Sequence, residues 1–121
     1  MLDVISILAG SELFSGLARD SYERIARHLK PVRFGRDHVI CREGDSGDTM
    51  YIIVKGTVSV SSDMGWGQRE LDRKGPGAVV GEMALISNDV RSATVRTLEE
   101  TECLLFDSES FDALLDQDPA L

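Results

Sequence analysis

Short apolar runs separated by glycines dominate the sequence between residues 31 and 107. The runs are rich in valine, isoleucine, threonine and tyrosine, which favour strands, and the glycines between them are typical of turns. We predict strands at 31–34, 38–41, 49–55, 57–62, 69–73, 78–80, 91–97 and 102–106. So many short strands in a chain of 121 residues indicate an eight-stranded jelly-roll β-barrel.

Two of these strands are expected to be buried in different ways. Residues 49–54 are almost continuously apolar, which is typical of a central strand that is covered on both faces. Val58 and Val60 instead alternate with Thr57 and Ser59, so this strand is expected to turn one face inward.

Helical patterns precede the strands. Apolar residues recur at helical spacing in two segments, one with Leu2, Ile5 and Leu8 and the other with Tyr22, Ile25, Ala26 and Leu29. Asp20 and Glu23 have the spacing of a capping box at the start of the second helix, and Pro31 is expected to end that helix.

A third helix is predicted after the strands, at 108–116. Asp107 and Ser108 are candidate N-caps, and Phe111, Leu114 and Leu115 form an apolar stripe. The fold class is therefore mainly β with flanking helices (β+α). We expect a single domain at 1–121, with a helical prelude at 1–30, a β-barrel at 31–107 and the C-terminal helix at 108–116.

Composition limits the classes of function. The formal net charge is −8, whereas nucleic-acid-binding modules present a basic face, so we expect no nucleic acid to bind through this domain. An anionic ligand would have to be held against the overall field, which indicates a small molecule in a pocket. The apolar stretch at 4–9 is too short to span a bilayer and lacks a basic start, so we expect no signal peptide and no membrane contact through this domain.

The sequence shows no pattern for a metal or a catalytic centre. Cys41 and Cys103 lie far apart without neighbouring histidines, and two buried reduced thiols favour a cytoplasmic location. The two histidines, His28 and His38, do not cluster as in a metal-dependent jelly-roll enzyme, and the carboxylates at 43–48 lack the spacing of a calcium loop. We therefore predict no metal, no cofactor and no enzymatic activity.

Residues 81–95 combine a glycine, a helix-permissive segment and an arginine that returns close by. Residues 82–86 are expected to form one helical turn, and the free backbone N–H groups of such a turn bind anions. Arg91 carries a planar fork of donors that grips a phosphate through two bonds. Glu82 would repel an anion unless it pairs with Arg91 and accepts a bond from a neutral hydroxyl, as a phosphate next to a sugar hydroxyl would allow. A structural ion pair between Glu82 and Arg91 is the alternative.

Two motifs resemble those of cyclic nucleotide-binding domains. Gly-Glu-Met-Ala-Leu at 81–85, together with Arg-Ser-Ala-Thr-Val at 91–95, resembles the phosphate-binding cassette of this family. The run Glu-Gly-Asp-Ser-Gly-Asp-Thr-Met-Tyr-Ile-Ile at 43–53 is similar to the family's glycine-rich turn and following strand. The sequence departs from the family pattern at Val90, where proline is frequent, and at Val80, where an aromatic residue is frequent. The resemblance covers about residues 14–115.

The resemblance implies a short phosphate-binding helix and a regulatory domain that senses cAMP, with cGMP as the alternative ligand. Glu82 would then accept a hydrogen bond from the ribose 2′-hydroxyl, Arg91 would pair with the cyclic phosphate, and Val60 would contact the base. Other residues would complete the phosphate cradle, so that the implied site consists of Gly81, Glu82, Met83, Ala84, Arg91, Ser92, Ala93 and Val60.

The resemblance also implies partners. Ligand binding would move the C-terminal helices and so control an effector domain in the same chain or in a partner chain, and a homodimer is compatible with this arrangement. Asp118-Pro119 has the pattern of a further helix start, so we expect the helix that covers the base to be truncated. The domain would lie in the cytoplasm, on its own or as the cytoplasmic part of a membrane protein. The alternative is a degenerate domain that serves assembly without ligand, although degenerate members usually lose the glutamate or the arginine.

Overall fold

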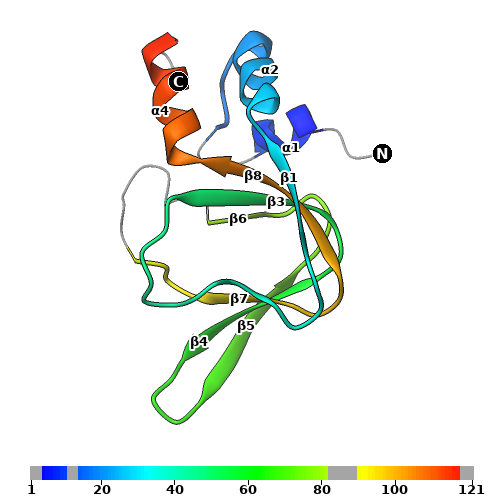
Figure 1. Cartoon of the computed structure of the whole chain (residues 1–121), viewed down its shortest axis with the longest axis vertical. Helices are drawn as coiled ribbons and strands as arrows, with labels where there is room; N and C mark the ends of the chain where they lie inside the picture. Colours follow the sequence, from blue (N-terminus) through cyan, green and yellow to red (C-terminus); the bar gives the residue numbers. More distant parts are fainter. Residues whose placement is uncertain (1–3, 11–13, 82–89, 118–121) are drawn as a thin grey trace.

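The computed structural model describes residues 4–10, 14–81 and 90–117. In these ranges the chain forms three helices and eight strands (Figure 1). The helices are α1 (Val4–Gly10), α2 (Arg19–Arg27) and α4 (Ser108–Gln117). The strands are β1 (Lys30–Phe34), β2 (Val39–Cys41), β3 (Thr49–Lys55), β4 (Val58–Asp63), β5 (Gln68–Lys74), β6 (Val79–Val80), β7 (Thr94–Thr97) and β8 (Thr101–Asp107). The predicted fold class, mainly β with flanking helices, is confirmed.

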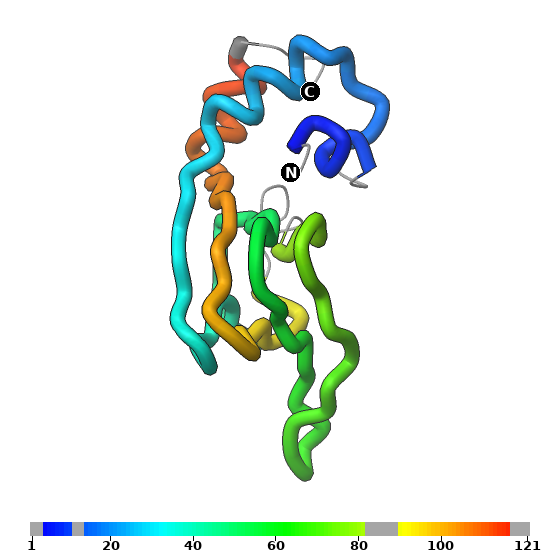
Figure 2. The backbone as a smooth tube through the Cα atoms, turned by 90° about the vertical axis from the view of Figure 1, so that its right-hand side faces the viewer, coloured from blue at the N-terminus to red at the C-terminus, as the bar shows by residue number. Residues whose placement is uncertain are grey.

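The strands form two antiparallel sheets of four. The first sheet has the order β1-β8-β3-β6 and the second has the order β2-β7-β4-β5. Among the described strands no pairing joins the two sheets into one closed barrel, so the jelly roll is a two-sheet sandwich. Figures 1 and 2 show the helices at one end of the sandwich and the β4–β5 hairpin projecting at the other.

β3 is buried as predicted, whereas β4 shows no clear alternation, because Val58 is buried but Ser59 and Val60 are both half-buried. β3 lies between β8 and β6, and its residues Met50, Tyr51, Ile52 and Ile53 are buried, as expected of a central strand. β7 is shorter than predicted, because it begins at Thr94 and not at Arg91. The backbone of Arg91 makes its hydrogen bonds with the turn between β2 and β3 and not with a neighbouring strand.

Two apolar clusters lie on opposite faces of the first sheet. The cluster between the sheets contains Cys41, Tyr51, Ile53, Val58, Val80, Val95 and Cys103. The cluster between the first sheet and the helices contains Leu8, Phe14, Tyr22, Ile25, Met50, Ile52, Phe106, Phe111 and Leu114. The rings of Phe14, Phe106 and Phe111 meet edge to face in the second cluster. The first sheet is thus the shared middle layer of the molecule.

The helix ends differ in how well their caps were predicted. Asp107 accepts a hydrogen bond from the N–H of Ser110 at 2.8 Å, which confirms it as the cap of α4 and holds its pKa below the usual range. The capping box predicted at Asp20 is wrong: α2 begins at Arg19, its N-cap is Ala18, and Asp20 lies inside the first turn. The carbonyl of Ala18 already accepts the first hydrogen bonds of the helix.

Both cysteines are free and buried, as predicted. Burial raises the pKa of Cys103 to about 11, with a smaller contribution from Cys41. In the described ranges, no helix is both long enough and apolar enough to cross a bilayer.

The hydroxyl of Tyr22 makes two hydrogen bonds that are expected to stabilise the fold. It donates to the carbonyl of Phe14 at 2.7 Å and accepts from the N–H of Leu17 at 3.2 Å, inside the cluster below the helices. Tyr22→Phe leaves both backbone groups without this partner, so we expect the free energy of unfolding to fall by about 1–3 kcal/mol in urea titrations. Tyr51→Phe is the control and is expected to cost less, because the hydroxyl of Tyr51 accepts one long hydrogen bond, from Oγ1 of Thr49 at 3.3 Å, within the described part of the chain. Equal losses would contradict this account.

Candidate anion-binding site

The main chain of Arg91 is fixed by the turn between β2 and β3. The N–H of Arg91 donates to the carbonyl of Asp45 at 2.8 Å, and the N–H of Gly44 donates to the carbonyl of Arg91 at 3.0 Å. Ser46 and Val90 form an isolated antiparallel bridge next to these bonds. The turn and the residues that lead into β7 therefore lie side by side at one edge of the sandwich, at the left of Figure 1.

The side chain of Arg91 reaches back over the start of β3. Its Nη2 donates to Oγ1 of Thr49 at 3.0 Å, and its Nη1 donates to the carbonyl of Gly81 at a longer 3.4 Å. Oγ1 of Thr49 in turn donates to the hydroxyl of Tyr51. The guanidinium thus joins Gly81, ten residues before it, to Thr49, which is 42 residues away in the sequence.

Two glycines leave room for this guanidinium. A Cβ at Gly47 would lie 2.6 Å from Cζ of Arg91, and a Cβ at Gly81 would lie 2.8 Å from the carbonyl oxygen of Thr49. Gly81 also has a φ of +78°, which disfavours a side chain on its own account. The positions of these glycines in the two sequence motifs thus have a steric cause.

The charge of Arg91 is not balanced by the described carboxylates. The ion pairs formed between described residues do not include it, and the partners of its side chain named above are neutral oxygens. Burial raises the pKa of the Cys41 thiol, and the positive charge of Arg91 partly opposes that shift. A half-buried cation with neutral partners attracts an anion that accepts from its fork.

The structure brings together part of the predicted site. Gly81 and Arg91 are in contact, Ala93 is half-buried, and Ser92 is exposed beside them. Val60 is half-buried on β4, opposite Val95 of β7, and packs against the cluster between the sheets. The predicted residues Glu82, Met83 and Ala84 lie outside the described residues, as does the short helix expected to contain them.

Two residues of the site were not predicted. Thr49 and Gly47 belong to the glycine-rich turn, where their residue types indicate only a turn followed by a strand. Their contacts with Arg91 join positions that are more than 40 residues apart, and no local pattern signals such a contact.

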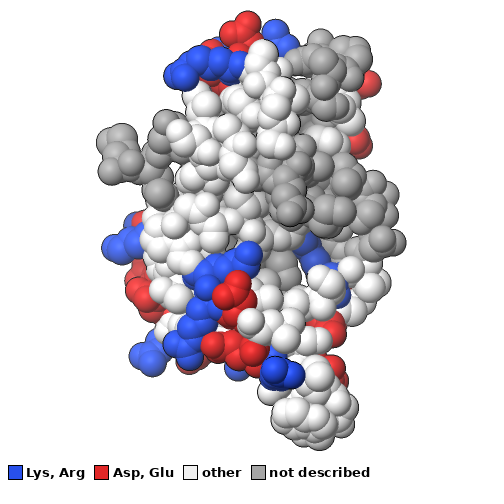
Figure 3. Space-filling view, turned by 180° about the vertical axis from the view of Figure 1, so that it is seen from behind, with Lys and Arg blue, Asp and Glu red and all other residues white. Residues whose placement is uncertain are grey.

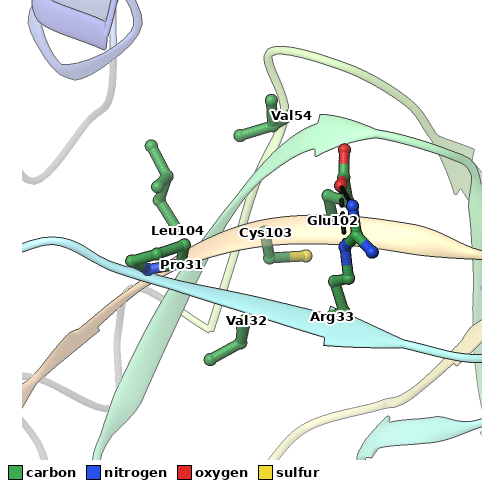
Figure 4. A pocket seen from close by; sticks show the side chains of 7 residues that line it. All are labelled: Pro31, Val32, Arg33, Val54, Glu102, Cys103 and Leu104. Atoms are coloured by element: carbon green, nitrogen blue, oxygen red, sulfur yellow. Dashed lines mark hydrogen bonds and ion pairs between the residues drawn. The ribbon is translucent and has the colours of Figure 1, made fainter.

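A separate hollow of about 400 Å³ lies over β1, β3 and β8 (Figure 4). Its lining is largely apolar and includes Pro31, Val54 and Leu104, with the ion pair of Arg33 and Glu102 at 2.7 Å. The donors of the Arg91 site are absent from it, so we assign the anion site to Arg91 and not to this hollow. On the face shown in Figure 3 the described basic side chains lie among acidic ones and form no continuous basic surface.

Comparison with known proteins identifies relatives of the whole described fold. The family model named cyclic nucleotide-binding domain matches residues 31–118, well over half of the chain. A cAMP-dependent protein kinase regulatory subunit of Dictyostelium discoideum is 38% identical over 101 residues, which is 78% of this chain and 31% of the relative. A cyclic nucleotide-gated potassium channel of Mesorhizobium japonicum is 37% identical over 115 residues, 95% of this chain and 31% of the channel. The chain therefore spans about a third of the length of these two relatives.

Solved structures show the same fold. A cyclic nucleotide-binding-like protein from Brucella abortus has a TM-score of 0.84 and 30% identity, and the match covers 95% of this chain and 99% of that one. The regulatory domain of Toxoplasma gondii PKA, solved with cAMP, has a TM-score of 0.83 and 27% identity, with 92% of this chain and 42% of that chain covered.

The contact between Gly47 and Arg91 can be tested without any ligand. Gly47 does not have a positive φ, so alanine is compatible with its backbone, but the new Cβ would collide with the guanidinium. We expect Gly47→Ala to lower the free energy of unfolding by about 1–3 kcal/mol in wild type. In an Arg91→Ala background the collision is gone, so the same change should cost less than about 0.5 kcal/mol. A cost that is equal in both backgrounds would contradict the contact.

Proposed function

We propose that this chain, which belongs to the cyclic nucleotide-binding domain family, senses cAMP and transmits its binding to an attached effector. The observation that carries the proposal is Arg91, a half-buried cation fixed at both backbone groups, whose described side-chain partners are neutral. A cyclic phosphate supplies the missing anion and accepts two bonds from the fork.

The other roles follow from the family resemblance. Glu82 accepts a hydrogen bond from the ribose 2′-hydroxyl, and the N–H groups of Met83 and Ala84 contribute to the phosphate cradle. Gly81, Ser92 and Ala93 complete the cradle, and Val60 offers an apolar contact to the base. A ligand of about two dozen heavy atoms at roughly 0.3 kcal/mol each gains about 7 kcal/mol, which corresponds to micromolar affinity.

cAMP is favoured over cGMP as the ligand. Ser92 is compatible with either nucleotide, because its hydroxyl can serve the phosphate or the amino group of guanine. The relatives support cAMP: one is named a cAMP-dependent kinase regulatory subunit, and the Toxoplasma domain was solved with cAMP.

Hydrogen bonds link Arg91 to the start of α4, through which the effector would be reached. Thr49 holds Nη2 of Arg91, and the carbonyl of the preceding residue, Asp48, accepts a hydrogen bond from the N–H of Ser108 at 2.8 Å. Ser108 is the first residue of α4. A shift of Arg91 on the phosphate is therefore transmitted to the start of α4 through three residues, and the ligand acts by favouring one of two positions of the helix.

The effector lies in the remainder of the protein or in a partner chain. The two curated relatives named above, a kinase regulatory subunit and a channel, each contain this unit as 31% of their length. We propose that residues 1–121 form one cyclic nucleotide-binding domain within such a regulator. The unit has no catalytic activity of its own and works in the cytoplasm, alone or as part of a membrane protein.

A thermal-melt series tests the proposal. A ligand that binds only the folded state at a hundredfold excess over its Kd stabilises by about 2.7 kcal/mol, or roughly 10 °C for a chain of this size. We expect 1 mM cAMP to raise the melting temperature by about this amount and cGMP by less, while 5′-AMP, which lacks the cyclic phosphate, serves as the control. The absence of a shift with both cyclic nucleotides would instead support the degenerate domain that serves assembly.

Arg91 can be tested by replacement with alanine. The phosphate loses its charged partner, so we expect binding to weaken by about 2–4 kcal/mol, roughly 30- to 1000-fold, in isothermal titration calorimetry. Arg96→Ala is the matched control, because Arg96 lies on the same segment but is exposed on β7, and its affinity should not change. Normal affinity in Arg91→Ala would remove Arg91 from the site.

A further inference from the structure

Glu43 fastens the glycine-rich turn to the β4–β5 hairpin. Its Oε1 accepts from Oγ of Ser62 at 2.8 Å, and its Oε2 accepts from the N–H of Asp63 at 2.7 Å. Both oxygens of one half-buried carboxylate are thus used by the last two residues of β4. Hydrogen bonds to a charged acceptor are about twice as strong as neutral ones.

These bonds lie where the hairpin leaves the second sheet. β7 pairs with β4 only as far as the pair of Ser61 and Thr94. The N–H of Glu43 donates to Oγ1 of that same Thr94 at 3.0 Å, so Glu43 continues the support of β4 past the end of β7. Beyond this point the hairpin projects freely, and its tip carries Trp66 with 78% of its surface exposed (Figures 1 and 2).

The residues next to Glu43 hold the arginine of the site. Gly44 and Asp45, which follow Glu43 directly, make the two hydrogen bonds to the main chain of Arg91. The carboxylate of Glu43, which is bonded to β4, therefore belongs to a residue only one or two positions before the two residues that bind the backbone of Arg91. Glu43 lies inside a turn that is closed by the hydrogen bond from the N–H of Asp45 to the carbonyl of Arg42 at 3.1 Å, so its carboxylate anchors this turn to β4.

We propose that Glu43 is a positioning residue for the cyclic-nucleotide site, which couples the β4–β5 hairpin to Arg91 without touching the ligand. The proposal rests on the function proposed above. An arginine that is held in the binding geometry before the ligand arrives loses less conformational freedom on binding, so the anchor raises affinity. A displacement of the hairpin changes the affinity through the same bonds.

The negative charge of Glu43 and its hydrogen bonds to β4 are expected to have opposite effects on the affinity for the ligand. A carboxylate near an anion site repels the ligand, so removal of the charge alone would tighten binding. Glu43→Ala removes both the charge and the anchor. Glu43→Gln removes the charge but keeps an oxygen for the N–H of Asp63 and an amide donor for Ser62. The two variants therefore separate the two effects by the direction of the change.

Glu70 provides the matched control. Its carboxylate also accepts from a serine of β4, Ser59, at 2.8 Å, and it pairs with Arg73 at 2.7 Å. These bonds stay within the hairpin and do not reach the turn, so Glu70→Ala removes a similar carboxylate without touching the support of Arg91. Its affinity for cAMP should equal that of wild type.

Calorimetric titration with cAMP gives the first reading. We expect Glu43→Ala to bind about tenfold more weakly than wild type, equivalent to 1.4 kcal/mol, and Glu43→Gln to bind within about twofold of wild type. Ser62→Ala breaks one of the two bonds from the other side, so it should weaken binding in the same direction by a smaller factor. Unchanged or tighter binding by both Glu43→Ala and Ser62→Ala would overturn the proposal.

Amide hydrogen exchange gives a second reading that needs no ligand. The N–H groups of Gly44 and Arg91 should exchange faster in Glu43→Ala than in wild type or in Glu70→Ala, because the turn opens more often. If wild type binds neither cyclic nucleotide, the proposed function fails while faster exchange still supports the anchor. Equal exchange of these two amides in Glu43→Ala and wild type overturns the anchor, whatever the ligand does.

Discussion

The candidate site depends on how one half-buried guanidinium is held. Arg91 is fixed through its backbone by Gly44 and Asp45 and through its side chain by Thr49 and the carbonyl of Gly81. Removal of a cation from water is costly unless its donors are satisfied, and the site meets this requirement with neutral oxygens. Among the described residues the hydrogen bonds of Arg91 are made with neutral groups, as the proposed anion site requires.

The two apolar clusters support different sides of the first sheet around this arginine. The cluster between the sheets includes Val80 and Val95, and the half-buried Val60 packs against it, so aliphatic residues lie behind the site. The cluster between the first sheet and the helices joins α2 and α4 to the outer face of the same sheet. Because β3 contributes residues to both clusters, its first residue, Thr49, lies where the ligand site and the helical layer meet. Close-packed elements of this kind transmit small shifts because they cannot deform gradually.

The fold could be predicted from the sequence wherever one segment carries its own signal. The apolar run of β3 and the alternation in β4 depend on nearest neighbours, and the strands were found close to their true bounds. At Arg91 a distant contact decides: its residue type and neighbours predict the first residue of a strand, but its backbone bonds go to Asp45. The error at α2 is local, because the helix starts after Ala18, whose carbonyl accepts the first helical hydrogen bonds, and not at the more conventional cap Asp20. The division of the strands into two sheets is a matter of long-range pairing.

The site was predicted only in part for the same reason. The glycine and the arginine of the cassette could be recognised because their motif is contiguous, whereas Thr49 and Gly47 contact the arginine from another motif. The sequence alone indicates a turn at Gly47 and a strand start at Thr49, and neither pattern signals a contact with a distant arginine. Their role emerges only when the two motifs are placed side by side, as the bridge of Ser46 and Val90 places them.

The acidity of the chain is consistent with such a local site. A net charge of −8 repels every anion at long range, but this repulsion is screened over roughly 8 Å at physiological ionic strength, whereas the contact with Arg91 acts below 4 Å. Extended polyanions would meet the acidic surface along their whole length, while a single cyclic phosphate in the proposed site would meet mainly the arginine. The same field that opposes binding overall therefore adds selectivity for a small, compact anion.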